Sequence, residues 1–233
     1  MLLNLWFGPT FLTMRAAKRG RKDLDPRLAG FVATFKERYG FAPLWIDLGS
    51  ITWDAVMSDR LIIALERTSQ LETFVREDPS FDPIQERAVI ELFDRECTGI
   101  LMPGGPLGLL RHVLDAKSLF VVFDQFESRA VEKAHGSICG RRLRAFEQQL
   151  GLGDRFWCTA SGAWPPVVFV YTDDQAAAVR ASGIQRSWAD LWYAMVKPFD
   201  EFGYISREDI EIVVDSKQNF DENYESNWRY YST

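Results

Sequence analysis

The chain has 233 residues, of which 47% are hydrophobic and 14% aromatic, so it holds enough apolar material to bury a substantial core. That composition excludes disorder of the whole chain. The formal net charge of -6 leaves no chain-wide basic field for a nucleic-acid backbone, and we expect no nucleic-acid partner. Three cysteines without Cys-x-x-Cys spacing favour a reducing compartment, so we expect a cytoplasmic protein.

Residues 1–22 form an N-terminal extension that is apolar first and basic afterwards. The apolar part, MLLNLWFGPTFLTM, precedes RAAKRGRK, which reverses the order of a secretory signal, and it is shorter than the about 20 residues of a membrane span. We therefore expect no targeting segment and no stable membrane insertion. A weak membrane or nucleic-acid contact through the basic residues is the alternative, and Met14 is an alternative first residue. The basic residues are Arg15, Lys18, Arg19, Arg21 and Lys22.

Residues 23–101 are predicted to be mainly helical. The clearest helix runs from Pro26 to Tyr39, because Asp25 suits the N-cap, apolar residues recur at helical spacing, and Gly40 suits the end. The other expected elements are a short strand at 43–48, a helix from Ser58 to Val75, and a helix from Ile84 to Glu96.

Residues 101–108, LMPGGPLG, concentrate glycine and proline and are the best candidate boundary. Beyond them, residues 109–233 predict an α+β part, although the whole chain could also form one continuous domain. We expect strands at 118–123, 156–160, 167–171, 210–214 and 228–231, and helices at 127–150, 172–182 and 187–197. The fold class is therefore mixed α+β: a helical N-terminal part followed by a small, mainly antiparallel sheet flanked by helices.

Few residues suited to catalysis are present. The histidines are His112 and His135, and the histidines and cysteines are scattered without ligand spacing, so we expect neither a metal nor another cofactor. His135 and Cys139 lie four apart on an expected helix, where they could form a nucleophilic pair, although simple packing with a surface imidazole is the stronger interpretation. The glycine-rich segment lacks a P-loop, and Ser161 lacks a nucleophile-elbow frame.

A metal-dependent nuclease is the sharpest enzymatic alternative. Asp215-Ser216-Lys217 follows an expected strand, and Asp200 precedes it, which resembles the PD-(D/E)xK nuclease core. In that core two acids hold a divalent metal and a lysine orients the attacking water, giving metal-assisted phosphodiester hydrolysis. The acidic surroundings oppose this alternative, because they repel nucleic acid.

A third possibility is an enzyme whose site is assembled at strand ends, where ligands often bind. Asp124, Asp173 and Asp174 are its candidates. The simpler interpretation of Asp173 and Asp174 is that they cap a helix.

The C-terminal part combines acids with aromatic residues. Between Phe199 and Trp228, two bases and nine acids give a net charge of -7. Acids at a rim and aromatic anchors at a centre are typical of a protein interface, and a basic protein is the natural partner. Packing of the aromatic residues onto a sheet, with the acids in solvent, is the alternative. The candidate partner-binding residues are Asp200, Glu201, Asp215, Asp221, Glu222, Tyr224, Glu225, Trp228 and Tyr230.

The last third of the chain also resembles known proteins. DSKQNFDENYESNWRYY, together with PPVVFVY, is similar to the ends of uncharacterised bacterial proteins, some of the kind found beside secreted toxin domains as immunity proteins. The resemblance carries no catalytic motif. It implies a cytoplasmic antidote that binds a toxin domain, commonly a basic nuclease, and blocks its active site or its access to substrate. We therefore expect a non-enzymatic immunity or inhibitor protein.

Overall fold

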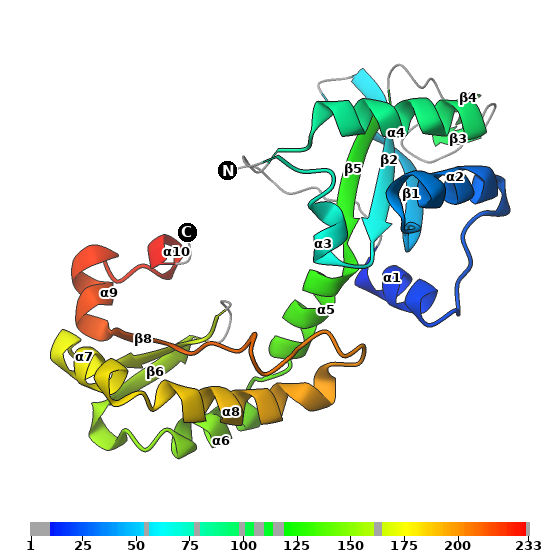
Figure 1. Ribbon diagram of the computed structural model, residues 1–233. Helices are drawn as coiled ribbons and strands as arrows, with labels where there is room; N and C mark the ends of the chain where they lie inside the picture. Colours follow the sequence, from blue (N-terminus) through cyan, green and yellow to red (C-terminus); the bar gives the residue numbers. More distant parts are fainter. Residues whose placement is uncertain are drawn as a thin grey trace. The chain divides into compact units, whose positions relative to one another are not determined.

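The computed structural model describes residues 10–53, 56–76, 80–97, 101–104, 110–113, 119–160 and 165–231. For residues 50–53, 56–58, 101–104 and 110–113 it describes the backbone alone. The chain divides into two compact units, residues 1–129 and 130–233 (Figure 1). The division falls inside a helix and not in the glycine- and proline-rich segment, of which 105–108 lie outside the described residues. The α+β class expected from the sequence is confirmed.

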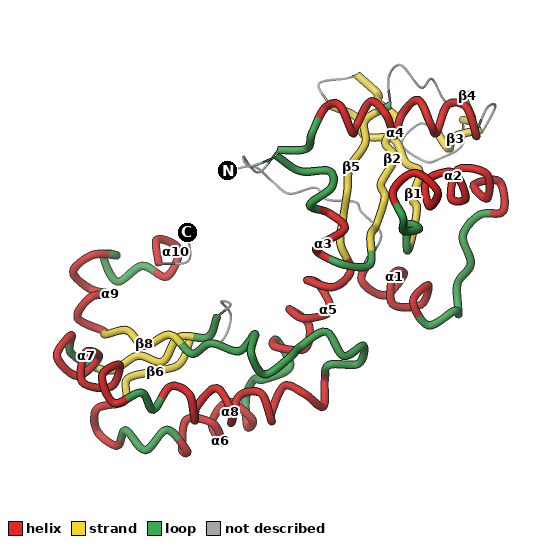
Figure 2. The backbone as a smooth tube through the Cα atoms, viewed as in Figure 1, coloured by secondary structure: helices red, strands yellow, loops and turns green. Residues whose placement is uncertain are grey.

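The first unit is built around a three-stranded sheet with the order β1-β2-β5 (Figure 2). β1 is antiparallel to β2, and β2 is parallel to β5, so the sheet is mixed. The elements are α1 (Phe11–Lys18), η1 (Pro26–Leu28), α2 (Ala29–Tyr39), β1 (Trp45–Trp53), β2 (Val56–Leu65), α3 (Thr68–Leu71), α4 (Pro83–Glu96), β3 (Leu101–Gly104), β4 (Leu110–Val113) and β5 (Phe120–Gln125).

The second unit has a three-stranded sheet with the order β6-β7-β8, again with one antiparallel and one parallel pair. Helix α5 (Phe126–His135) spans the division between the units. The following elements are α6 (Arg141–Gln149), η3 (Gly153–Arg155), β6 (Phe156–Ala160), β7 (Val167–Val170), α7 (Asp173–Ser182), α8 (Gln185–Val196), η4 (Lys197–Phe199), β8 (Val213–Ser216), α9 (Lys217–Asn223) and α10 (Trp228–Tyr231).

Helix boundaries largely follow the capping residues. Asp25 Oδ1 accepts a hydrogen bond from the Arg27 amide at 2.9 Å, and Gly40 ends α2 with a φ of 81°. Thr172 caps α7, and Gly183 ends it with a φ of 70°. Glycine suits these ends because it lacks the Cβ that penalises left-handed backbone. The predicted helices at 26–39, 84–96 and 172–182 are confirmed within two residues of each end.

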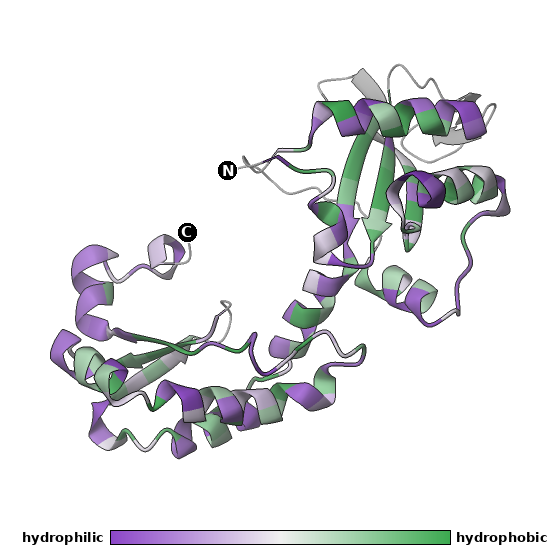
Figure 3. Ribbon diagram, viewed as in Figure 1, coloured by the Kyte–Doolittle hydropathy of each residue, from purple (hydrophilic) through white to green (hydrophobic). Residues whose placement is uncertain are grey.

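The core of the first unit lies on one face of its sheet. Leu61, Ile63 and Leu65 of β2 are fully buried there with Val121 and Phe123 of β5. The aromatic rings of α2 and of the segment after α3 cover these strands, and Figure 3 shows the middle of each strand in the hydrophobic colour. Phe74 stacks on Phe123 with ring centroids 4.0 Å apart.

The opposite face of this sheet is covered by the segment that the sequence suggested was an extension. Met14 of α1 is fully buried, and Lys18 Nζ lies 2.6 Å from Glu66 Oε1. Lys22 lies 4.5 Å over the Trp45 ring. Burial raises the pKa of Asp47, and the nearby cations oppose that rise. Residues 10–22 are therefore an integral part of the first unit.

The second unit buries both faces of its sheet. Helices α6, α7 and α8 cover one face, where Trp188 and Trp192 pack with Val168, Val170 and Val214. Helix α9 covers the opposite face through Phe220, which packs against Val167 and Phe169. Because β7 alternates its side chains between the two faces, every residue of this strand is buried.

The helix predicted from Ser58 to Val75 is wrong. Residues 56–65 form β2, and only Thr68–Leu71 are helical. Residues 61–65 are a continuous apolar run in which every side chain is at most 1% exposed, as in a strand buried on both faces. A short run of this kind fits a helix and a buried strand equally well by periodicity.

Four smaller predictions need correction. The last strand is 213–216 and not 210–214, because its four residues pair with the four residues of β7. Ser187 lies inside α8, where its hydroxyl donates to the Ile184 carbonyl at 2.8 Å. Residues 228–231 form a helical turn instead of an edge strand. The sheets are mixed, because a crossover connection makes β8 parallel to β7.

Phe74→Ala should destabilise the protein by about 3–5 kcal/mol, because it removes a buried ring and leaves a cavity between α2 and β5. Phe120→Ala is the matched control: Phe120 is 51% exposed, and its truncation should cost less than about 1 kcal/mol. Urea unfolding followed by circular dichroism measures both. Equal midpoints for the two variants would contradict the assignment of the core.

Candidate functional site

The chain ends in a structured cap on the second sheet. We call residues 216–231 the C-terminal cap; it comprises α9, α10 and the turn between them. Ser216 caps α9 by accepting a hydrogen bond from the Asn219 amide at 2.8 Å. Phe220 and Trp228 lie 4.3 Å apart by ring centroids, and both pack near Phe169. The cap is therefore a folded layer and not a loose terminus.

The Asp215 carboxylate joins three parts of this layer. Its Oδ1 accepts from the Ser216 amide at 2.7 Å, and its Oδ2 accepts from Asn219 Nδ2 at 2.9 Å. The Tyr231 hydroxyl donates to the same Oδ2 at 2.7 Å. Burial and this hydrogen bond raise the pKa of Tyr231 well above its usual range, so the phenol stays a neutral donor. Strand β8, α9 and α10 are thus tied to one carboxylate.

A second polar group shapes the turn between α9 and α10. Lys217 Nζ bonds Asp221 Oδ2, and the Ser226 hydroxyl donates to Asp221 Oδ1 at 2.7 Å. The hydrogen bond from Lys217 holds the pKa of Asp221 below its usual value, with Ser226 acting in the same direction. Glu225 and Ser226 both have left-handed backbone, with φ of 53° and 55°. Consecutive non-glycine residues in this region are uncommon, so the polar contacts help to hold the turn.

The cap leaves an acidic and aromatic surface exposed. Trp228 is 44% exposed and Tyr230 is 51% exposed, and Glu222 and Glu225 are exposed beside them in the chain. We call these four residues the cap surface. Trp228 also stacks on Trp157 of β6 at 5.9 Å, so one part of its indole is anchored and another faces solvent.

The start of α7 lies against the cap. The Asp173 amide donates to Gln218 Oε1 at 3.4 Å, and the Ser216 hydroxyl bonds Asp173 Oδ1. Asp173 and Asp174 are exposed in the first turn of α7, behind the Thr172 cap. The sequence separated these acids from the C-terminal ones, since 42 residues lie between Asp173 and Ser216. Parallel pairing of β7 and β8 brings them together.

Several of the residues predicted to bind a partner make hydrogen bonds within the fold. The Asp200 side chain is 4% exposed; its Oδ2 lies 2.8 Å from Lys197 Nζ, and the carboxylate accepts from the amides of Tyr204 and Ile205. These hydrogen bonds lower the pKa of Asp200 although burial opposes them. Asp200 is therefore corrected to a turn-forming residue. Asp215 and Asp221 are engaged as described above.

Two other predicted residues differ in exposure. Tyr224 is half-buried, with its ring edge to face with Tyr231 at 4.8 Å, so it contributes to packing of the cap. Glu201 is exposed in the turn that follows η4. Of the nine predicted residues, the structure therefore leaves five exposed: Glu201, Glu222, Glu225, Trp228 and Tyr230.

The three residues of the nuclease alternative occupy three different local arrangements. Asp200 organises its own turn, Asp215 bonds Asn219 and Tyr231, and Lys217 pairs with Asp221 and lies 5.4 Å over the Trp157 ring. Within the described part of the chain, no group of three or more His, Cys, Asp and Glu residues is placed to hold a metal ion.

The proposed His135–Cys139 pair does not share a helix face. Helix α5 ends at His135, and Cys139 is exposed in the turn beyond it. The imidazole is buried, with Nδ1 accepting from Trp192 Nε1 at 3.0 Å. Burial lowers the pKa of His135 to about 4, partly offset by the charge of Asp200. The expectation that His135 is a surface imidazole is therefore wrong, because the ring is buried; the expectation that the region is a packing arrangement is correct. The side chains of His112 and Ser161 lie outside the described residues.

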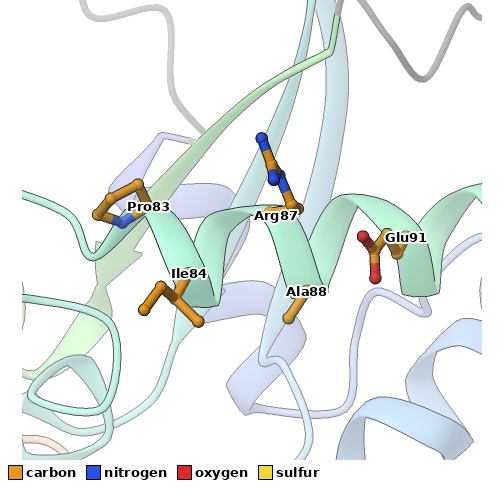
Figure 4. A pocket seen from close by; sticks show the side chains of 5 residues that line it. All are labelled: Pro83, Ile84, Arg87, Ala88 and Glu91. Atoms are coloured by element: carbon orange, nitrogen blue, oxygen red, sulfur yellow. The ribbon is translucent and has the colours of Figure 1, made fainter.

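The remaining strand-end acid, Asp124, belongs to the first unit. It is 7% exposed and lies 2.7 Å from Arg129, while burial raises its pKa. A pocket of about 440 Å³ lies beside α4 and is lined by one face of that helix, including exposed Ile84 and the charged Arg87 and Glu91 (Figure 4). None of the predicted site residues lines it.

Comparison with known proteins adds no relative. No family model, no curated protein and no solved structure matches this chain. In the described ranges, no helix has both the length and the apolar character to cross a membrane.

Tyr231→Phe should remove the hydrogen bond to Asp215 and destabilise the protein by about 1–2 kcal/mol, because a partly buried carboxylate loses a donor. Hydrogen exchange should show the lost protection concentrated in residues 216–231. Tyr171→Phe is the control: Tyr171 is 44% exposed, and we expect a loss of less than about 0.5 kcal/mol there. A change spread evenly over the chain would contradict this role.

Lowering the pH should decrease the free energy of unfolding, because His135 is buried in its neutral form. The folded pKa of about 4 lies below the ordinary histidine pKa of 6.5, so the unfolded chain takes up a proton first as the pH falls. The stabilisation that results from keeping His135 neutral in the folded state is complete above pH 6.5 and is lost progressively toward pH 4. The free energy of unfolding should fall by on the order of 2 kcal/mol between pH 7 and pH 5. Urea midpoints at these two pH values measure it. His135→Gln should flatten the dependence, and an unchanged slope in this variant would refute the assignment.

Proposed function

We propose that the chain is a non-enzymatic binding protein of the immunity or inhibitor type, acting in the cytoplasm on a basic toxin or nuclease domain. The cap surface carries this proposal: two large aromatic side chains are about half exposed on a folded layer, and two exposed carboxylates precede them by a few residues in the chain. Tryptophan and tyrosine are the side chains that most often dominate binding energy at protein interfaces.

Preorganisation favours tight binding at this surface. The indole of Trp228 rests on Phe220 and Trp157, and α10 is tied to Asp215 through Tyr231. Side chains that are already ordered lose little conformational entropy when a partner binds. The surface can therefore present its aromatic groups without the cost of folding a disordered tail.

Charge selects the chemistry of the partner. The stretch from Phe199 to Trp228 carries a net charge of -7, and Asp173 lies against the cap, with exposed Asp174 next to it in the chain. Such a field repels nucleic acid and attracts a basic protein, and it raises the rate of encounter at low salt. A nuclease domain presents basic groups where it holds phosphate, so carboxylates bound there would block substrate access.

The test begins with affinity capture, using the full chain as bait in a lysate of the source organism supplemented with proteins encoded by neighbouring genes. The captured partner is then purified, and its affinity is measured by calorimetry at two salt concentrations. Trp228→Ala should weaken binding by about 10- to 100-fold, as expected for a central aromatic anchor. Glu222→Gln with Glu225→Gln should reduce both the association rate and its salt dependence.

Matched controls separate this surface from general effects. Glu132→Gln with Asp154→Asn makes the same charge change at exposed positions of the second unit, and Phe120→Ala removes an aromatic side chain that is 51% exposed. Both controls should bind like the wild type. Equal affinity of the Trp228, Glu222 and Glu225 variants, or capture of acidic partners alone, would refute the proposal.

A further inference from the structure

The sheets of the two units have the same design. In each, an antiparallel hairpin is followed by a crossover that contains two helices and returns to a parallel third strand, giving β1-β2-β5 and β6-β7-β8. The first crossover also contains the β3-β4 hairpin, which is an insertion relative to the second. A helix precedes each hairpin, and a glycine with left-handed backbone follows that helix. These glycines are Gly40 after α2, with φ 81°, and Gly151 after α6, with φ 66°. Apart from β3 and β4, the order of helices and strands therefore agrees from α2 to β5 and from α6 to β8.

The first crossover helix begins with the same hydrogen bonds in both units. Gln70 Oε1 accepts from the amides of Glu66 and Arg67 at 2.9 and 3.0 Å. Gln175 Oε1 accepts from the amides of Tyr171 and Thr172 at 3.0 and 3.2 Å. A glutamine that reaches back to two consecutive amides is a specific device and is not required by the topology.

The ends of the parallel strands also match bond for bond. The Glu127 amide donates to the Glu66 carbonyl at 3.0 Å, and the Gln218 amide donates to the Tyr171 carbonyl at 3.1 Å. The Thr68 amide donates to Glu127 Oε2, as the Asp173 amide does to Gln218 Oε1. These bonds join the third strand's exit to the start of the crossover.

One acid takes the same place in both third strands. Asp124 pairs in register with Ala64, one residue before the end of β5, and Asp215 pairs with Phe169, one residue before the end of β8. Each carboxylate accepts from the next amide, at 2.8 and 2.7 Å. The residues before them are similar as well: Val121-Val122-Phe123 and Ile212-Val213-Val214.

The two cores are equivalent but separate. Phe35, five residues before Gly40, and Phe146, five residues before Gly151, are both fully buried under the crossover helices. Every member of the larger core cluster in the first unit lies between residues 24 and 123, and every member of the two clusters in the second lies between residues 131 and 231. Each unit thus encloses its own apolar side chains.

We propose that the two units are copies of one αββααβ module and that each copy is a complete cooperative folding unit. This inference stands apart from the proposed function. The copies differ in what covers the second sheet face: the first uses the α1 segment from before the module, and the second uses the C-terminal cap from after it. The cap surface is therefore an addition to one copy.

Hydrogen exchange on the full chain tests this proposal through equivalent substitutions. Phe35→Ala should lower amide protection by at least about 100-fold in residues 29–125 and leave residues 141–231 within about twofold of the wild type. Phe146→Ala should do the reverse. Equal loss of protection in both units from either substitution would overturn the proposal. If an alanine variant does not fold, Phe35→Leu and Phe146→Leu serve the same comparison.

A milder pair tests the equivalence itself. Gln70→Ala should deprotect the amides of Glu66 and Arg67, and Gln175→Ala should deprotect those of Tyr171 and Thr172, by the same factor within about threefold. A strong effect at one position with none at the other would show that the two helix starts are not equivalent and would overturn the assignment of copies.

Discussion

Each three-stranded sheet must be covered on both faces, and this requirement sets where the helices and the terminal segments pack. A sheet of this size is stable only when its apolar side chains are packed against other layers. The crossover helices cover one face in both units, whereas terminal segments cover the other. This is why Met14 and Phe220, which lie near opposite ends of the chain, are both buried.

The cap shows how a structural carboxylate can support a binding surface. Asp215 lies where β8 ends and receives hydrogen bonds from its own strand, from α9 and from α10. Glu222 and Glu225 of the same cap are exposed instead, so their carboxylates face solvent and can meet a partner. The division between acids that hold the fold and acids that face outward gives the proposed inhibitor both a rigid surface and a negative field.

The internal copies explain why the same residue types recur with different consequences. Asp124 pairs with Arg129 in the first unit, whereas the equivalent Asp215 binds Tyr231 of the added cap. The matched positions Phe35 and Phe146 both hold a fully buried ring, whereas the matched positions Ala64 and Phe169 differ in size, so each core is packed with its own set of side chains. As a result the two units share hydrogen bonds and register while their sequences show little obvious similarity.

Local signals in the sequence determined the α+β class, the helices that start at Asp25 and Thr172, and the acidic, aromatic character of the C-terminus, because capping and composition act over a few residues. Tertiary structure alone decided three other features. It made residues 61–65 a strand, since an apolar run fits a strand or a helix until its neighbours are known. It also buried Asp200 and set Asp173 against the cap, because strand pairing, and not sequence distance, determines which side chains meet.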